Sequence, residues 1–115
     1  MDIEHLRTLC LALPNATEDV KWGNDLCFCV GGKMFCVTCL SGPFGASFKV
    51  RDEEFLDMCS RPAIIPAPYV ARYKWVYVER GDAMSDAEWA ERIDTSYRLV
   101  AAALPAKVRK GLDPL

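Results

Sequence analysis

The sequence lacks the short motifs that usually mark an enzyme or a metal site. It has no Gly-x-Ser-x-Gly, no His-Glu-x-x-His and no glycine-rich phosphate loop ahead of a helix. The one histidine, His5, falls on a different face of a predicted helix from the nearest cysteine, Cys10, so the two do not form a catalytic pair. We therefore expect a protein that acts by binding, that is not an enzyme and that has no cofactor or metal.

Long hydrophobic runs and a secretory leader are also missing. No stretch approaches the roughly 20 apolar residues that cross a bilayer, and Met1-Asp2-Ile3-Glu4 has neither a basic nor an apolar leader region. We expect no membrane partner and a cytoplasmic location. In that compartment cysteines stay reduced, so thiols rather than disulfides are expected at Cys10, Cys27, Cys29, Cys36, Cys39 and Cys59.

What the sequence does contain is enough apolar material for one core. The chain has 115 residues, of which 51% are hydrophobic, and the aromatic residues include three Trp, four Tyr and five Phe. This composition excludes disorder, and the length is that of one ordinary domain. We expect a single domain over residues 1–115.

The order of apolar patterns predicts helices near both ends and strands between them. Helices are expected over residues 2–13, 53–59 and 86–104, and strands over 19–22, 26–30, 33–40, 46–50 and 72–78. Residues 61–69 contain three prolines, which predicts a stiff, extended loop instead of a helix or a central strand. Residues 113–115 are expected to fray. The order indicates a two-layer α+β fold, with a single antiparallel sheet of about five strands backed by helices.

Two glycines predict a hairpin in the middle of the sheet. Gly31-Gly32 separates two β-rich runs, and tight hairpin turns need the positive φ that glycine adopts easily. With this turn, Cys27 is expected to face Cys36, and Cys27, Cys29 and Cys36 share one face while Cys39 lies on the other. Four thiolates on opposite faces cannot surround one zinc ion. Packed free thiols and an oxidisable Cys27–Cys36 pair stay open as alternatives.

Charge is sorted by element type, although the net charge is only −2. Residues 20–51 and 61–80, mostly strands and their loops, hold eight basic and two acidic residues, a net charge of +6. The rest of the chain holds six basic and fourteen acidic residues, a net charge of −8. We therefore expect the sheet face that the helices leave open, and the hairpin tips, to be positive.

Aromatic residues alternate with a lysine on the last predicted strand, where Tyr73, Trp75 and Tyr77 flank Lys74. Phosphate attraction combined with base stacking is the physical basis of many nucleic-acid surfaces. The alternative is that the lysines keep the sheet soluble and that the aromatics belong to the core.

Seven fragments in one order resemble the MmcQ/YjbR family over nearly the whole chain. They are Leu13-Pro14, Trp22-Gly23, Gly32-Lys33-Met34-Phe35, Phe48-Lys49, Pro66-Ala67-Pro68-Tyr69, Lys74-Trp75-Val76 and Ser96-Tyr97-Arg98-Leu99-Val100. The resemblance implies a CyaY-like, secretion-chaperone-like fold and a DNA-binding role through a double-wing motif, with the Gly31-Gly32 tip and Lys33 in a wing. It implies no catalytic residues. The four cysteines of the hairpin depart from the family pattern.

Three hypotheses follow for the binding partner. The first is DNA, held mainly through phosphates by a basic sheet face and hairpin wings; the candidate residues are Lys21, Lys33, Lys49, Arg51, Arg72, Lys74 and Trp75. The second is a protein or peptide, or a second copy of the chain, at Pro62–Tyr69 and the aromatic strand. The third is a small ligand in a pocket between the proline-rich loop and the sheet. Both a monomer and a homodimer are compatible with the sequence.

Overall fold

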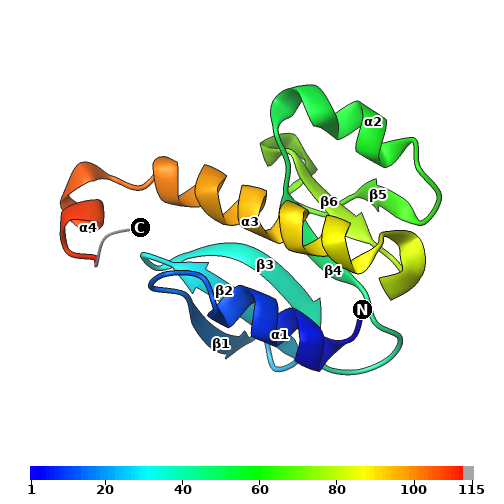
Figure 1. Cartoon of the computed structure of the whole chain (residues 1–115), viewed down its shortest axis with the longest axis horizontal. Helices are drawn as coiled ribbons and strands as arrows, with labels where there is room; N and C mark the ends of the chain where they lie inside the picture. The colour runs from blue at the N-terminus through cyan, green and yellow to red at the C-terminus, as the bar shows by residue number, and fades with distance from the viewer. Residues whose placement is uncertain (113–115) are drawn as a thin grey trace.

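Six strands form one antiparallel sheet in the computed structural model, which describes residues 1–112 (Figure 1). The expected fraying of residues 113–115 lies outside the described residues. The strand order is β1-β2-β3-β4-β6-β5, so β1 and β5 are the two edges. The strands are β1 (Thr17–Lys21), β2 (Asp25–Val30), β3 (Lys33–Cys39), β4 (Ala46–Lys49), β5 (Ile64–Pro66) and β6 (Trp75–Val78).

Helices cover one face of this sheet. They are α1 (Ile3–Leu11), α2 (Phe55–Cys59) and α3 (Asp86–Ala102), while the short helix α4 (Ala106–Lys110) lies beyond the end of the sheet, beside the hairpin tip (Figure 1). The long helix α3 lies over β3 and β4 and packs on α1, while α2 lies against β5 and β6 (Figure 1). Side chains cap two N-termini, because Asp2 accepts from the His5 amide at 2.8 Å and Ser85 accepts from the Glu88 amide at 3.1 Å. The two-layer α+β prediction is confirmed, with six strands instead of five.

The core lies between the sheet and the helices. Alternate strand residues such as Phe28, Phe48 and Val76 point to the helices and are completely buried. They meet Trp89 and Tyr97 of α3, which are buried to the same degree. Each such large side chain contributes about 1.5–3 kcal/mol of transfer free energy. The opposite sheet face carries no helix, and we call it the open face.

The predicted loop 61–69 contains the sixth strand. Ile64–Pro66 pairs antiparallel with β6, with Ile64 opposite Val78 and Pro66 opposite Val76. Proline has no backbone N–H, which excludes it from central strands but not from an edge. The loop prediction was therefore wrong for three residues, although the exclusion of a central strand agrees with the edge position.

The predicted hairpin is present, but its register is not the simple one. Gly31 and Gly32 have φ values of 57° and 82°, as a type I′ turn requires, and Val30 pairs with Lys33. A β-bulge follows, because Cys29 pairs with Met34 whereas Phe28 pairs with Cys36. Phe35 is the extra residue, and the bulge lets Phe35 and Cys36 both be buried in the core.

This bulge changes which cysteines share a face. Cys27 lies opposite Val37 rather than Cys36, so the predicted Cys27–Cys36 pair was wrong. Cys27, Cys29 and Cys39 are on the open face, while Cys36 lies on the helix side, where its thiol meets Cys10 of α1. The four hairpin cysteines still divide between two faces, but Cys36 is the exception instead of Cys39.

A buried serine connects α3 to the bulge. The Ser96 hydroxyl donates to the Phe35 carbonyl at 2.6 Å and accepts from the Lys49 amide at 2.9 Å. Ser96 has no exposed surface, so this hydroxyl satisfies two backbone groups that water cannot reach. The bulge and the end of β4 are therefore held to the middle of α3.

The predicted strand 72–78 begins later than expected. Ala71–Tyr73 forms a 3-10 turn, and Lys74 ends it in the left-handed conformation with φ 66°. Only Trp75–Val78 is extended. Tyr73 and Lys74 therefore do not belong to the alternating strand surface that the sequence pattern predicts, whereas Trp75 and Tyr77 do.

Candidate functional site

One end of the sheet collects several of the predicted site residues. At this end β3 begins with Lys33, β4 ends with Lys49, and β6 begins with Trp75. These three residues line a cavity of about 300 Å³ together with Leu104 and other residues near the C-terminus of α3. Lys49 and Trp75 are register partners, and the Lys49 ammonium donates to the Tyr73 carbonyl. Trp75 is only 8% exposed, so it forms a wall and not a free stacking ring.

Three further predicted residues flank this end. The Lys74 ammonium lies 5.2 Å from the centre of the Phe55 ring. The Arg72 guanidinium lies 4.8 Å from the centre of the Tyr73 ring and donates to its hydroxyl at 2.7 Å. Arg51 makes a 3.4 Å ion pair with Glu54. Acidic residues of the 3-10 turn Asp52–Glu54 follow Arg51 and limit the positive region on that side.

The structure separates Lys21 from the other six residues. Lys21 ends β1 and is the register partner of Asp25, so it lies at the opposite end of the sheet. Alternation places Lys21 and Lys49 on the open face, together with Asp19 and Asp25. These charges balance, so the expectation that the open face would be positive was wrong.

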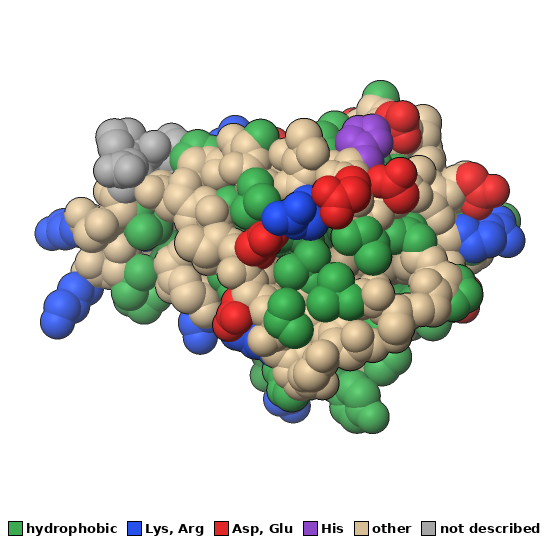
Figure 2. All heavy atoms as spheres, turned by 90° about the horizontal axis from the view of Figure 1, so that it is seen from below, with side chains coloured by type: hydrophobic (Ala, Val, Ile, Leu, Met, Phe, Trp, Pro, Cys, Tyr) green, Lys and Arg blue, Asp and Glu red, His purple; other side chains and the backbone are tan. Residues whose placement is uncertain are grey.

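Helix α4 supplies three cations that the sequence interpretation missed, Lys107, Arg109 and Lys110. This helix lies beside the hairpin tip, where Leu104 and Val108 pack closely on Gly31. A Cβ atom on Gly31 would lie only 2.7 Å from Leu104 Cδ1 and 3.1 Å from Val108 Cγ1. Figure 2 shows Lys and Arg side chains projecting from the α4 end, while acidic side chains gather toward the other half. The basic residues directly after Pro105 could have revealed this helix. The charge count by element type included them in the part of the chain with a net charge of −8, so their positive charge was overlooked.

We call the cations around these strand ends and α4 the basic end. Within residues 1–112 none of them takes part in an ion pair. The basic end comprises Lys33, Lys49, Arg72, Lys74, Lys107, Arg109 and Lys110.

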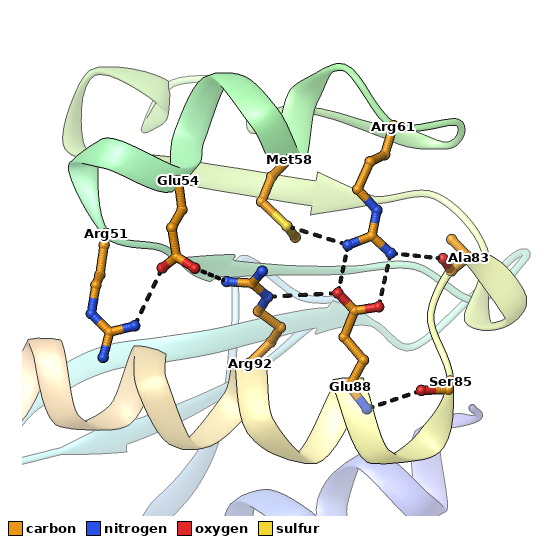
Figure 3. Close-up of polar contacts among 8 residues, drawn as sticks. All are labelled: Arg51, Glu54, Met58, Arg61, Ala83, Ser85, Glu88 and Arg92. Atoms are coloured by element: carbon orange, nitrogen blue, oxygen red, sulfur yellow. Dashed lines mark hydrogen bonds and ion pairs between the residues drawn. The ribbon is translucent and has the colours of Figure 1, made fainter.

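Between α2 and α3, in contrast to the basic end, arginines form ion pairs with glutamates (Figure 3). Arg61 donates to Glu88 through both terminal nitrogens, one of them at 2.8 Å. Arg92 lies 2.7 Å from Glu54 and 3.8 Å from Glu88. The hydrogen bond from Arg61 holds the pKa of the Glu88 carboxyl below its usual value. We call these four side chains and Arg51 the ion-pair network.

Burial opposes activation of three hairpin cysteines as nucleophiles. Burial raises the pKa of the Cys27 and Cys29 thiols, although Lys21 nearby acts in the opposite direction. Burial also raises the pKa of Cys36 strongly. A raised pKa keeps a thiol protonated at neutral pH and lowers its reactivity. Within residues 1–112 no group of three His, Cys, Asp or Glu side chains is arranged to hold a metal ion.

A second cavity, of about 530 Å³, lies on the open face between the sheet and the segment after β5. Its aromatic walls come from three places in the chain: Trp22 after β1, Tyr69 after β5, and Trp75 in β6. Asp25 contributes the one carboxylate of the lining. Of the sequence hypotheses, the pocket beside the proline-rich loop therefore has a matching cavity.

The arrangement of a six-stranded antiparallel sheet with helices on one face defines an α+β class that solved structures share. A Deinococcus radiodurans protein with a domain of the DUF419 family has a TM-score of 0.86 and 26% identity, covering 97% of this chain and 89% of its own. A Pseudomonas syringae protein of 16% identity has the same fold, with a TM-score of 0.74 over 87% of this chain and 99% of its own.

The family follows from the sequence itself. The model of the YjbR family matches residues 11–99, and the chain belongs to that family. This confirms the resemblance to MmcQ/YjbR proteins. No curated protein matches the chain. Among residues 1–112 no helix is long and apolar enough to cross a membrane.

Proposed function

We propose that the chain binds DNA through phosphate contacts at the basic end. The observation that carries the proposal is the set of seven cations that form no ion pair within residues 1–112 and lie at the ends of β3, β4 and β6 and on α4. Cations that already hold carboxylates would have to exchange partners to bind phosphate, whereas these would give up at most a carbonyl, hydroxyl or aromatic contact and would release solution counterions. Lys33 at the hairpin tip and α4 beside it form a protruding edge that can follow a duplex backbone.

The proposed contacts specify position rather than base sequence. Lysine and arginine bind phosphate oxygens through charge, which carries no sequence information by itself. Trp75 is almost completely buried, so it supports Lys49 and does not stack on bases. The net charge of −2 also opposes long-range attraction, so we expect moderate, strongly salt-dependent affinity. We also propose that the chain works in the cytoplasm, where its six free cysteines would stay reduced.

The test is a titration of a labelled DNA duplex against the protein at several salt concentrations, followed by fluorescence anisotropy. Each neutralised phosphate contributes about 0.9 to the slope of log K against log[salt], so four to five contacts would give a slope near −4. A flat salt response, or no binding at low salt, would contradict the proposal.

Matched variants locate the interface. Lys33→Glu combined with Lys74→Glu should abolish binding at the basic end. Lys21→Glu reverses one charge at the other end of the sheet. It should reduce affinity by less than about threefold, because only long-range repulsion, which salt screens, acts from there. If Lys21→Glu weakens binding as much as the double variant, the basic end is not the interface.

A further inference from the structure

The open-face cavity combines aromatic walls with a carboxylate, although it shares Trp75 with the cavity at the basic end. Three aromatic side chains, Trp22, Tyr69 and Trp75, line it from separate segments, and Asp25 is its only carboxylate. The Asp25 side chain is half-buried and makes no ion pair within residues 1–112, although its register partner is Lys21. Aromatic rings around a carboxylate form an environment that favours a cation with an apolar surface.

The two outer aromatic residues are unusually exposed for their size. Trp22 is 72% exposed and Tyr69 is 100% exposed, and both belong to loops that flank the same cavity. Burying such large rings is normally favourable, so leaving both in water sacrifices stability that packing would supply. Their positions indicate a surface that becomes buried when something enters the cavity.

The backbone at these two residues has an uncommon conformation. Trp22 has φ 52° and Tyr69 has φ 69°, which lie in the left-handed region that bulky residues rarely adopt. Gly23, directly after Trp22, also has a positive φ of 81°. Two unfavourable backbone conformations at the rims of one cavity are typical of positions that clamp a ligand.

We propose that this cavity binds an organic ammonium ion, such as a quaternary or methylated amine, between the three aromatic side chains and Asp25. The aromatic faces attract the positive charge through their quadrupoles, and the methyl groups bury apolar surface against Met34 and Val37 on the floor. The carboxylate of Asp25 supplies the compensating charge. A volume of about 530 Å³ accommodates a small head group with room for an attached chain.

The first experiment tests whether charge matters. Choline chloride is titrated into ¹⁵N-labelled protein, with sodium chloride as the ionic control and 3,3-dimethylbutan-1-ol as the neutral molecule of the same shape. The indole N–H signals of Trp22 and Trp75 should shift and saturate with choline. The Trp89 signal should not move, because that ring is fully buried and its N–H donates to the Gly81 carbonyl at 2.8 Å.

The neutral molecule should bind at least about 5-fold more weakly than choline, the difference that a cation–aromatic contact typically makes. Equal affinities for the two molecules would overturn the assignment, since the cavity would then be merely apolar. Shifts that sodium chloride reproduces, or that do not saturate, would overturn it as well.

Variants then test the residues. Asp25→Asn and Trp22→Ala should each weaken choline binding by about 5- to 30-fold. Both residues lie outside the core, so the thermal unfolding midpoint should change little. Leu56→Ala removes another side chain that is 80% exposed, on α2 far from the cavity lining, and should leave affinity unchanged. If Asp25→Asn binds choline as well as the parent protein, the carboxylate has no part in recognition and the proposal fails.

A last comparison identifies the source of the cation. A short peptide with one trimethyllysine, measured beside its unmodified form, should bind through the same Trp22 signal. Tighter binding of the methylated peptide than of choline would assign the site to a protein side chain, and the reverse order would assign it to a free small molecule. Binding of the unmodified peptide with equal affinity would overturn selectivity for alkylated ammonium. Lys33→Glu should not affect any of these measurements, which separates this site from the DNA interface.

Discussion

The ion-pair network and the basic end treat positive charge in opposite ways. Every cation that forms an ion pair within residues 1–112 is an arginine; they are Arg7, Arg51, Arg61, Arg80, Arg92 and Arg98. No lysine in that part of the chain forms one, and five of the seven cations of the basic end are lysines. Arginine presents a rigid fork that matches a carboxylate, whereas lysine is a flexible, well-hydrated point charge.

The comparison separates charges that hold the fold from charges that are available to a partner. In the network Arg92 is only 17% exposed and Glu88 26% exposed, so these groups have lost much of their hydration and depend on one another. At the basic end the α4 cations are exposed and form no ion pair within residues 1–112, so replacing them should cost little stability. The free energy of unfolding should therefore distinguish the two regions.

The largest loss of stability is expected for Glu88→Ala. It would remove the partner of Arg61 and one partner of Arg92, leaving two guanidinium groups partly desolvated. We expect a decrease of about 2 kcal/mol in the free energy of unfolding, below the 3–5 kcal/mol of a fully buried pair. Urea denaturation measures it. Glu91→Ala, on the same helix but exposed and unpaired within residues 1–112, should change stability by less than about 0.5 kcal/mol.

Acid provides a second measure of the same network. The pKa of Glu88 is lowered in the folded protein, first by its hydrogen bond from Arg61. A lowered folded pKa means that the stabilisation is complete above the unfolded value near 4.5 and is lost as pH falls through the folded value. Stability should therefore decline below about pH 4.5 in the parent protein and decline less in Glu88→Gln. Identical slopes would show that the pair contributes nothing.

A smaller loss of stability is expected at Ser96, which connects α3 to Phe35 and Lys49. Ser96→Ala would leave the Phe35 carbonyl and the Lys49 amide without a partner in a site closed to water. The expected cost is about 1–2 kcal/mol, the penalty of unsatisfied buried polar groups. Ser47→Ala is the control, because Ser47 lies half-exposed on the open face of β4. Equal effects of the two substitutions would mean that the Ser96 hydroxyl is not a structural connection.

The smallest effect on stability is expected at the basic end. Replacing Lys107, Arg109 and Lys110 together with glutamine should change the free energy of unfolding by less than about 0.5 kcal/mol, since none is buried or paired within residues 1–112. The same variant should reduce the slope of log K against log[salt] for DNA by up to about 2.7. A large loss of stability would contradict the distinction between the two regions.

Much of the fold could be predicted from local pattern, whereas the register could not. Gly31-Gly32 determined the position of the hairpin, because both residues need positive φ. The bulge at Phe35 could not be predicted, since Met34-Phe35-Cys36-Val37 is apolar throughout and alternation gives no sign of an extra residue. For the same reason Cys36 was paired with Cys27 and assigned to the wrong face. Pro66 suggested a loop, although an edge strand tolerates it.

The candidate sites depend on positions that composition does not reveal. Sorting charges by element type predicted a positive sheet face, but Asp19 and Asp25 lie on that face beside the lysines. What brings Lys33, Lys49 and α4 to one end is the direction of the strands and the packing of Leu104 over Gly31. Likewise Trp22 and Tyr69 are far apart in sequence, and only the order of the strands places them around one cavity.

The two edge strands have a consequence for how copies of this chain can meet. β5 contains Pro66, which has no N–H to offer a further strand, and β1 carries Glu18, Asp19 and Lys21 along its length. A strand from another molecule would lack one hydrogen-bond donor if it paired with β5. If it paired with β1, it would lie beside charged side chains. Both edges therefore disfavour pairing with a strand of another molecule, which limits edge-to-edge association between copies of this chain.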